Sequence, residues 1–119
     1  MKKVLWISRH EMTVPQRRDL ERILGGGVEL VPWRDTVRDP AVLAPAIRAA
    51  DAVAAVLPPA LLAGVVKLAE GRPVLQAVSA RAATGRERVL PDGRREPEFA
   101  FVHRWWEQIL RLEVETRRL

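Results

Sequence analysis

The stretch WISRHEMTVPQ, residues 6–16, is the part of the sequence that best indicates the fold. It begins inside an apolar run, residues 3–8, which is too short for a helix and contains branched side chains, so we expect a buried strand there. Thr13 and Gln16 then match the capping box that opens a helix, with Pro15 in its first turn. A polar turn between a buried strand and a helix is where open α/β sheets keep their ligand sites.

The same order of strand and helix recurs through the first eighty residues. Helices are predicted from Thr13 to the glycines at 25–27, over 39–50 with a kink at Pro45, and over 58–71; strands are predicted at 3–8, 28–33, 51–57 and 72–79. Such alternation implies right-handed crossovers and a parallel sheet covered on both faces. The predicted fold class is therefore α/β, with a Rossmann-like, mostly parallel sheet and helices on both faces.

The pattern changes after Ser79. Residues 84–105 hold a Pro-Asp-Gly turn between two segments of alternating character, which predicts an antiparallel hairpin. Residues 106–119 suit either a strand or a helix, and the alternation of Leu110, Leu112 and Val114 leads us to favour a strand. We expect a single domain, with an alternating core over 1–80 and a hairpin with a C-terminal extension over 81–119.

Composition narrows the classes of function. The 119 residues include no cysteine, which excludes thiol catalysis and thiolate metal sites. The N-terminus is too short and too soon interrupted by Arg9 and His10 for a signal peptide, and no apolar run approaches the ~20 residues of a membrane span. We expect a soluble cytoplasmic protein without membrane contact.

The net charge of +5 would attract a polyanion, although such an excess is also common on an ordinary solubilising surface. Acidic residues do not cluster at ligand spacing, and the two histidines are far apart in the sequence. We therefore predict neither a metal site nor a cofactor.

Ser8, Arg9 and His10 are the first candidates for chemistry. They precede a helix N-terminus, where backbone N–H groups and the helix dipole attract an anion, and a guanidinium can pair with a phosphate. An imidazole titrates near neutral pH and can serve as acid or base, but a loop histidine can also simply cap or pack. The turn lacks glycine, which disfavours a dinucleotide fingerprint or a P-loop.

A second group follows the fourth predicted strand. Ser79 and Arg81 could face the same crevice as the first turn, because the ends of nonadjacent parallel strands converge there, with Thr84 and Arg86 as a rim. The alternative is a strand exit that needs small residues only to turn.

Aromatic residues give weaker indications. Trp33, with Arg34 after it, could stack on a base at the end of the second strand, although a core or interface tryptophan is the simpler account. His103, beside Trp105 and Trp106, is expected to be packed or hydrogen-bonded rather than a ligand.

Two segments resemble a known family. SRHEMTVPQ (8–16) and AVSARAATGRERVLPDGRREPEFAFVH (77–103), with its Leu-Pro-Asp-Gly turn and Phe-x-x-x-His close, resemble the small CRISPR-associated Rossmann-like (CARF-like) ring nucleases of type III CRISPR systems. The intervening helices match only in order and length. The resemblance implies binding of cyclic oligoadenylate, with cyclic tetra-adenylate as the expected ring, and its cleavage to linear products that no longer activate effectors.

The family's histidine corresponds to His10, whereas Arg9 and Glu11 fall where family members vary. The candidate catalytic residues are His10 and Arg9, and the candidate ligand-binding residues are Ser8, Thr13, Gln16, Ser79, Arg81, Thr84 and Arg86. A sensor that binds the ring without cutting it, or a basic nucleic-acid-binding module without sequence-specific DNA recognition, remains an alternative. Because one crevice would surround only part of such a ring, we expect a homodimer with the ligand at its interface.

Overall fold

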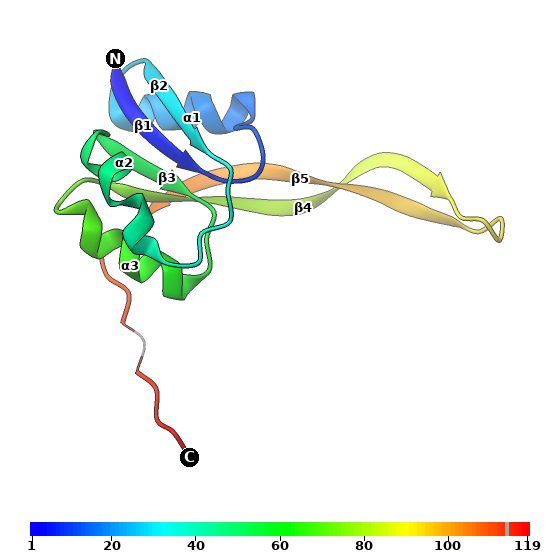
Figure 1. Ribbon diagram of the computed structural model, residues 1–119. Helices are drawn as coiled ribbons and strands as arrows, with labels where there is room; N and C mark the ends of the chain where they lie inside the picture. Colours follow the sequence, from blue (N-terminus) through cyan, green and yellow to red (C-terminus); the bar gives the residue numbers. More distant parts are fainter. Residues whose placement is uncertain (114) are drawn as a thin grey trace.

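The computed structural model describes residues 1–113 and 115–119 and contains one five-stranded sheet with helices on both faces (Figure 1). The strands are β1 (Lys2–Ile7), β2 (Val28–Trp33), β3 (Ala52–Ala55), β4 (Val74–Val89) and β5 (Arg95–Gln108). Their order is β2-β1-β3-β4-β5; the first four are parallel, and β5 pairs antiparallel with β4. The predicted α/β, mostly parallel fold is confirmed.

The helices begin and end largely where their sequence signals lie. They are α1 (Val14–Leu24), the 3-10 helix η1 (Pro40–Leu43), α2 (Ala44–Arg48) and α3 (Pro59–Ala69). Thr13 caps α1 in a complete capping box, and Gly25 ends it with a φ of 81°, which favours glycine. The single helix expected over 39–50 is two short pieces, because Pro45 cannot supply the N–H that a continuous helix needs.

Each face of the sheet has its own core. On the α1 face, the buried side chains of β1 meet Leu20 of α1 and Trp106 of β5. On the opposite face, η1, α2 and α3 cover Leu5, Ile7 and Val53 with apolar side chains such as Leu43, Ile47, Leu62 and Val65. Strands buried on both faces explain why β1 and β3 are apolar runs without alternation.

The β4–β5 hairpin is longer than the sequence patterns predicted. The expected strand end at Ser79 is wrong, because β4 continues without interruption to Val89. The predicted turn is confirmed: Leu90 donates its N–H to the carbonyl of Arg94, and Gly93 donates to Leu90. Beyond the last pairing of β3 with β4, at Gln76, the two strands leave the sheet, and we call residues 79–102 the arm (Figure 1).

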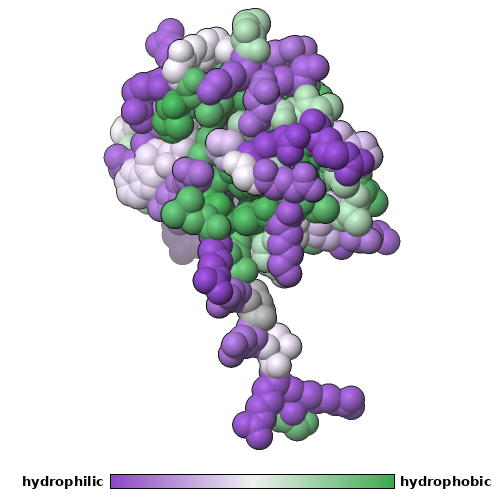
Figure 2. All heavy atoms as spheres, turned by 90° about the vertical axis from the view of Figure 1, so that its left-hand side faces the viewer, coloured by the Kyte–Doolittle hydropathy of each residue, from purple (hydrophilic) through white to green (hydrophobic). Residues whose placement is uncertain are grey.

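The strand expected over 106–119 is also wrong beyond Gln108, although residue 114 lies outside the described residues. Ile109 and Leu112 instead pack against the core on the α3 face, and the last residues run away from the sheet with mostly hydrophilic side chains (Figures 1 and 2). Burial of Ile109 and Leu112 against the core therefore replaces strand pairing after Gln108. None of the helices in the described part of the chain has the length and apolar character needed to cross a membrane.

Candidate functional site

A pocket of about 360 Å³ lies where β1, β2 and β3 end, at the carboxyl edge of the sheet. We call it the carboxyl-edge pocket. Its walls are Ile7, Ser8, Arg9 and His10 after β1, Trp33, Asp35, Thr36 and Val37 after β2, and Val56, Leu57, Pro58 and Leu61 between β3 and α3. Three segments far apart in the sequence therefore form one concave surface.

The strand order explains why the pocket is here. The chain leaves β1 through α1 towards β2 on one side, whereas β3 lies on the other side of β1. The connections after β1 and β3 consequently pass over opposite faces of the sheet and leave a crevice between them. This is the topological switch point at which open α/β sheets bind ligands.

Hydrogen bonds fix the backbone of the turn that follows β1. Ser8 donates its N–H to the carbonyl of Trp33 at 3.2 Å. The indole of Trp6 donates to the carbonyl of His10 at 2.9 Å, and the N–H of His10 donates to the hydroxyl of Ser8 at 3.2 Å. With its main chain held in this way, the exposed side chain of His10 is presented to solvent at the pocket wall.

Arg9 is the cationic group of the pocket wall. One of its guanidinium nitrogens donates to the hydroxyl of Thr36 at 2.6 Å, which ties the turn after β1 to the turn after β2. A guanidinium has five N–H donors, so this bond leaves donors for an anion. Asp35 places one carboxylate in the same wall. Because this carboxylate repels negative charge, an anion in the pocket must lie beside Arg9 and away from Asp35.

The first turn of α3 forms the remaining wall. Pro58 precedes the helix, and its carbonyl accepts hydrogen bonds from the N–H groups of Leu61 and Leu62. These N–H groups are therefore occupied, but the positive end of the helix dipole still lies at the pocket. Together with Arg9 it opposes the negative charge of Asp35.

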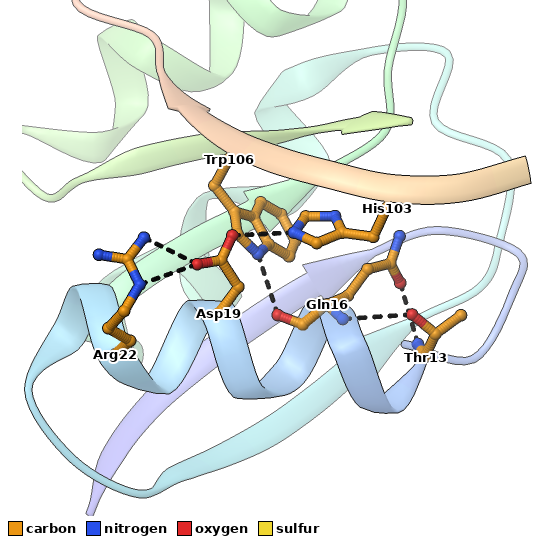
Figure 3. A network of polar contacts seen from close by, with 6 residues as sticks. All are labelled: Thr13, Gln16, Asp19, Arg22, His103 and Trp106. Atoms are coloured by element: carbon orange, nitrogen blue, oxygen red, sulfur yellow. Dashed lines mark hydrogen bonds and ion pairs between the residues drawn. The ribbon is translucent and has the colours of Figure 1, made fainter. Parts of the chain in front are cut away.

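Thr13 and Gln16, also predicted as ligand-binding residues, cap α1 instead of lining the pocket (Figure 3). The hydroxyl of Thr13 accepts the N–H of Gln16 at 3.3 Å, and the side-chain carbonyl of Gln16 accepts the N–H of Thr13 at 2.9 Å. Both side chains are thus engaged in local structure.

Within one chain, the structure does not bring the second predicted group to the pocket. Alternation along β4 places Ser79 and Arg81 on the face of Leu75, which α1 covers, whereas the pocket opens on the α3 face. Arg81 lies 4.0 Å over the ring of Phe99, in a separate groove on the arm. Ser79 and Arg81 are separated from the pocket because β4 continues past Ser79 and does not end at the carboxyl edge.

Thr84 and Arg86 lie further out, where a bulge interrupts the pairing of β4 with β5. The hydroxyl of Thr84 accepts the N–H of Arg86 at 3.2 Å and donates to the carbonyl of Glu98 at 3.4 Å. These contacts shape the bulge and do not form a rim around the pocket of the same chain.

His103 belongs to a network between α1 and β5, as the expectation of a packed or hydrogen-bonded residue implied (Figure 3). Its Nε2 lies 2.9 Å from a carboxylate oxygen of Asp19, whose other oxygen accepts from Arg22 at 2.7 Å. The hydrogen bond from His103, followed by that from Arg22, lowers the pKa of Asp19 below its ordinary value. Trp106 adds a bond from its indole to the carbonyl of Gln16 at 3.0 Å.

Sequence reasoning missed part of the pocket wall. Asp35 and Thr36 directly follow the strand that ends at Trp33, so the rule that carboxyl ends of parallel strands converge would have indicated them. For Trp33 the sequence allows stacking on a base or, more simply, a place in the core or an interface. Trp33 packs against the core and also lines the pocket, with its indole nitrogen buried and without a hydrogen-bond partner among the described residues.

No group of three or more potential metal ligands occurs among residues 1–113 and 115–119. Comparison of the chain with protein-family models, with curated proteins and with solved structures finds no match. The site must therefore be interpreted from its own geometry.

Proposed function

We propose that this protein is a cytoplasmic, metal-independent ring nuclease that binds cyclic oligoadenylate, with cyclic tetra-adenylate as the expected ring, and cleaves it to linear products, ending type III CRISPR signalling. The observation that carries the proposal is the meeting of Ser8, Arg9 and His10 in a pocket at the switch point of the sheet. The resemblance of residues 8–16 and 77–103 to such nucleases supplies the choice of ligand.

The pocket has the features that a nucleotide unit requires. Arg9 offers a charge-assisted contact to a phosphate, and the hydroxyl of Ser8 offers a further hydrogen bond. The apolar walls, among them Trp33, Leu57 and Leu61, can bury one face of an adenine. Asp35 would contact the sugar or the base edge, because it would repel a phosphate.

The reaction needs only groups that the ligand and this wall supply. The ribose 2′-OH attacks the adjacent phosphorus, the bond to the 5′-oxygen breaks, and a linear chain with a 2′,3′-cyclic phosphate and a 5′-hydroxyl results. His10 takes the proton of the 2′-OH or returns one to the 5′-oxygen, and Arg9 stabilises the charge that develops on the phosphate oxygens. Holding the 2′-oxygen in line with the phosphorus supplies the remaining acceleration.

Two chains would act on one ring. A pocket of about 360 Å³ accommodates a single nucleotide unit far better than a ring of four. A homodimer with the ring on its twofold axis uses each side chain of the wall twice and contacts more of the ligand. This stoichiometry is part of the proposal.

The test is an assay of the purified protein with labelled cyclic tri-, tetra- and hexa-adenylate in the presence of EDTA, with product analysis by chromatography. We expect linear products from the four-membered ring, and a His10→Ala variant that keeps its fold and cleaves ~10²–10⁴-fold more slowly. Glu11→Ala is the matched control, because Glu11 is the exposed next residue, 3.5 Å from Arg34, and is absent from the pocket wall.

Two results would overturn the proposal. Tight binding of the ring without products would make the protein a sensor. Equal affinity for linear RNA and for the ring, falling steeply with salt, would indicate a general nucleic-acid-binding module.

A further inference from the structure

The arm contributes no residue to the pocket, so the proposed function gives it no role within one chain. Beyond Gln76, β4 pairs only with β5 in the described part of the chain, so a two-stranded ribbon leaves the body with both edges open (Figure 1). A two-stranded hairpin alone is at best marginally stable in water. Exposed strand edges also favour pairing with another chain.

Apolar side chains are concentrated on and beside this ribbon. Phe101 is 81% exposed, Trp105 52%, Val102 45% and Phe99 44%. Phe99 and Phe101 lie on one face of the ribbon and Val102 on the other, since neighbouring residues of a strand alternate. The arm therefore offers apolar surface in more than one direction.

The charges of the arm and its base fit a second copy better than a polyanion. Residues 79–108 contain six arginines and five carboxylates, a net charge of only +1. Three of the arginines pair within the arm, Arg88 with Glu96, Arg94 with Asp92 and Arg95 with Glu87. A surface with both signs in nearly equal number can be complementary to a copy of itself, whereas nucleic acid requires an excess of cations.

The direction of the arm places such a copy at the pocket. β4 runs parallel to β1 and β3, and its continuation past Gln76 carries the arm beyond the carboxyl edge at which those strands end. From Ser79 to Val89, where β4 ends, the strand spans roughly 33 Å at 3.3 Å per residue. A second chain brought to this edge would lie alongside the arm.

We propose that the arm is the element by which two copies of this chain associate, each arm lying against the body of the other copy with the two carboxyl edges facing one another. This association does not require the ligand. The further statement that both pockets face a single ring rests on the proposed function.

The exposed aromatic surface is sufficient for such a contact. At roughly 200 Å² for each aromatic side chain, the exposed parts of Phe99, Phe101 and Trp105 amount to roughly 350 Å² per copy. About 65% of a homodimer interface is apolar, so burying this surface in both copies corresponds to roughly 1,100 Å² in total. Specific interfaces begin at about this size.

Analytical ultracentrifugation of the ligand-free full chain tests the inference. We expect wild type to sediment at twice the 13.4 kDa chain mass, and Phe101→Glu with Val102→Glu to weaken dimerisation at least roughly tenfold, because each substitution occurs twice per interface. Ile23→Glu is the matched control: Ile23 is 40% exposed in the last turn of α1, at the opposite edge of the sheet, and its variant should remain dimeric.

Circular dichroism verifies that each variant is folded. If the double variant does not fold, Phe101→Ser alone, at the most exposed of the four positions, carries the same test. A monomeric wild type at the highest soluble concentration, or a double variant that dimerises like wild type, overturns the inference. A monomer that binds linear RNA through the arm would assign the arm to nucleic acid. Dimerisation without ring binding would instead refute only the proposed function.

Discussion

Arg9 connects two turns and faces the pocket at the same time. Its bond to Thr36 fixes the guanidinium between the ends of β1 and β2, so less side-chain freedom is lost when an anion binds. This arrangement suggests that the cation is preorganised for a phosphate.

We predict that Arg9→Ala weakens binding of cyclic tetra-adenylate by about 1.5–3 kcal/mol, the usual contribution of a hydrogen bond to a charged group. Isothermal titration of a cleavage-deficient His10→Ala background measures the affinity directly. Thr36→Val, which keeps the charge but removes the tether, should cost less, about 0.5–1.5 kcal/mol. Equal affinity of all three proteins would place the ligand elsewhere.

Asp19 is a residue whose ionisation links stability to pH. Its pKa is lowered in the folded protein, first by the hydrogen bond with His103 and then by Arg22. A carboxyl group with a lowered folded pKa contributes stability above its unfolded pKa, and this contribution is lost as the pH falls through the folded pKa.

We predict that Asp19→Asn destabilises the protein by about 1–2 kcal/mol at neutral pH, and that its difference from wild type shrinks once the pH falls below 3.8, the ordinary value for aspartate. Urea denaturation at a series of pH values measures both effects. Glu21→Gln, which breaks only the exposed pair with Arg17, serves as control and should show a much smaller change. A difference independent of pH would contradict the assigned role of the carboxylate.

At the scale of elements, α3 and η1 approach one another closely at a single glycine. A Cβ on Gly64 would lie 2.5 Å and 2.8 Å from two ring carbons of Pro40, and a proline ring cannot move aside as a long side chain can. Since α3 also forms a wall of the pocket, this contact helps to set the pocket's width.

We predict that Gly64→Ala destabilises the protein by up to about 2 kcal/mol, because overpacking costs about 1–3 kcal/mol and the better helix propensity of alanine returns only about 1 kcal/mol. Thermal or urea denaturation measures the change. Gly26→Ala is the control, since no atom lies within 4 Å of its added Cβ, and should stay within about 0.5 kcal/mol of wild type. A more stable Gly64→Ala would mean that α3 can move away from η1.

Local signals in the sequence were enough to predict most elements of the core, although not the division of residues 39–50 into η1 and α2. Thr13 with Gln16 identified the start of α1, and the Pro-Asp-Gly turn identified the hairpin, because both depend on backbone chemistry within a few residues. The extent of β4 was not predictable in this way. Small and hydroxylated residues around Ser79 resemble a strand exit, yet pairing with β5 holds them in the strand.

The same distinction applies to the site. The turn of Ser8 to His10 was predicted from its place after β1, and the structure puts it in a pocket wall. Arg81 was assigned to that crevice on the assumption that β4 ends nearby, whereas alternation along the longer strand directs it to the opposite face. Asp35 and Thr36 complete the wall because they follow β2, so the rule applied to the turn after β1 would have indicated them as well.

At the scale of the whole molecule, the pocket and the arm lie at the same edge of the sheet. The parallel strands bring three turns together there, and the antiparallel hairpin continues beyond that edge. The switch-point pocket and the exposed apolar side chains of the arm therefore lie where a second copy can contact both.

We therefore predict one ring per two chains at saturation, measured by titration of His10→Ala protein with cyclic tetra-adenylate and by sedimentation of the complex. A ring with repeated identical units matches a twofold assembly, in which both Arg9 guanidinium groups pair with phosphates of the same ligand. If the arm holds the dimer, the variant with Phe101→Glu and Val102→Glu should bind the ring more weakly at low protein concentration and recover affinity as the protein concentration rises, because dimerisation then limits binding. The control Ile23→Glu should bind like the His10→Ala parent when placed in that background. One ring per chain, or an affinity independent of protein concentration in the arm variant, would show that a single pocket suffices and would leave the arm with a separate role.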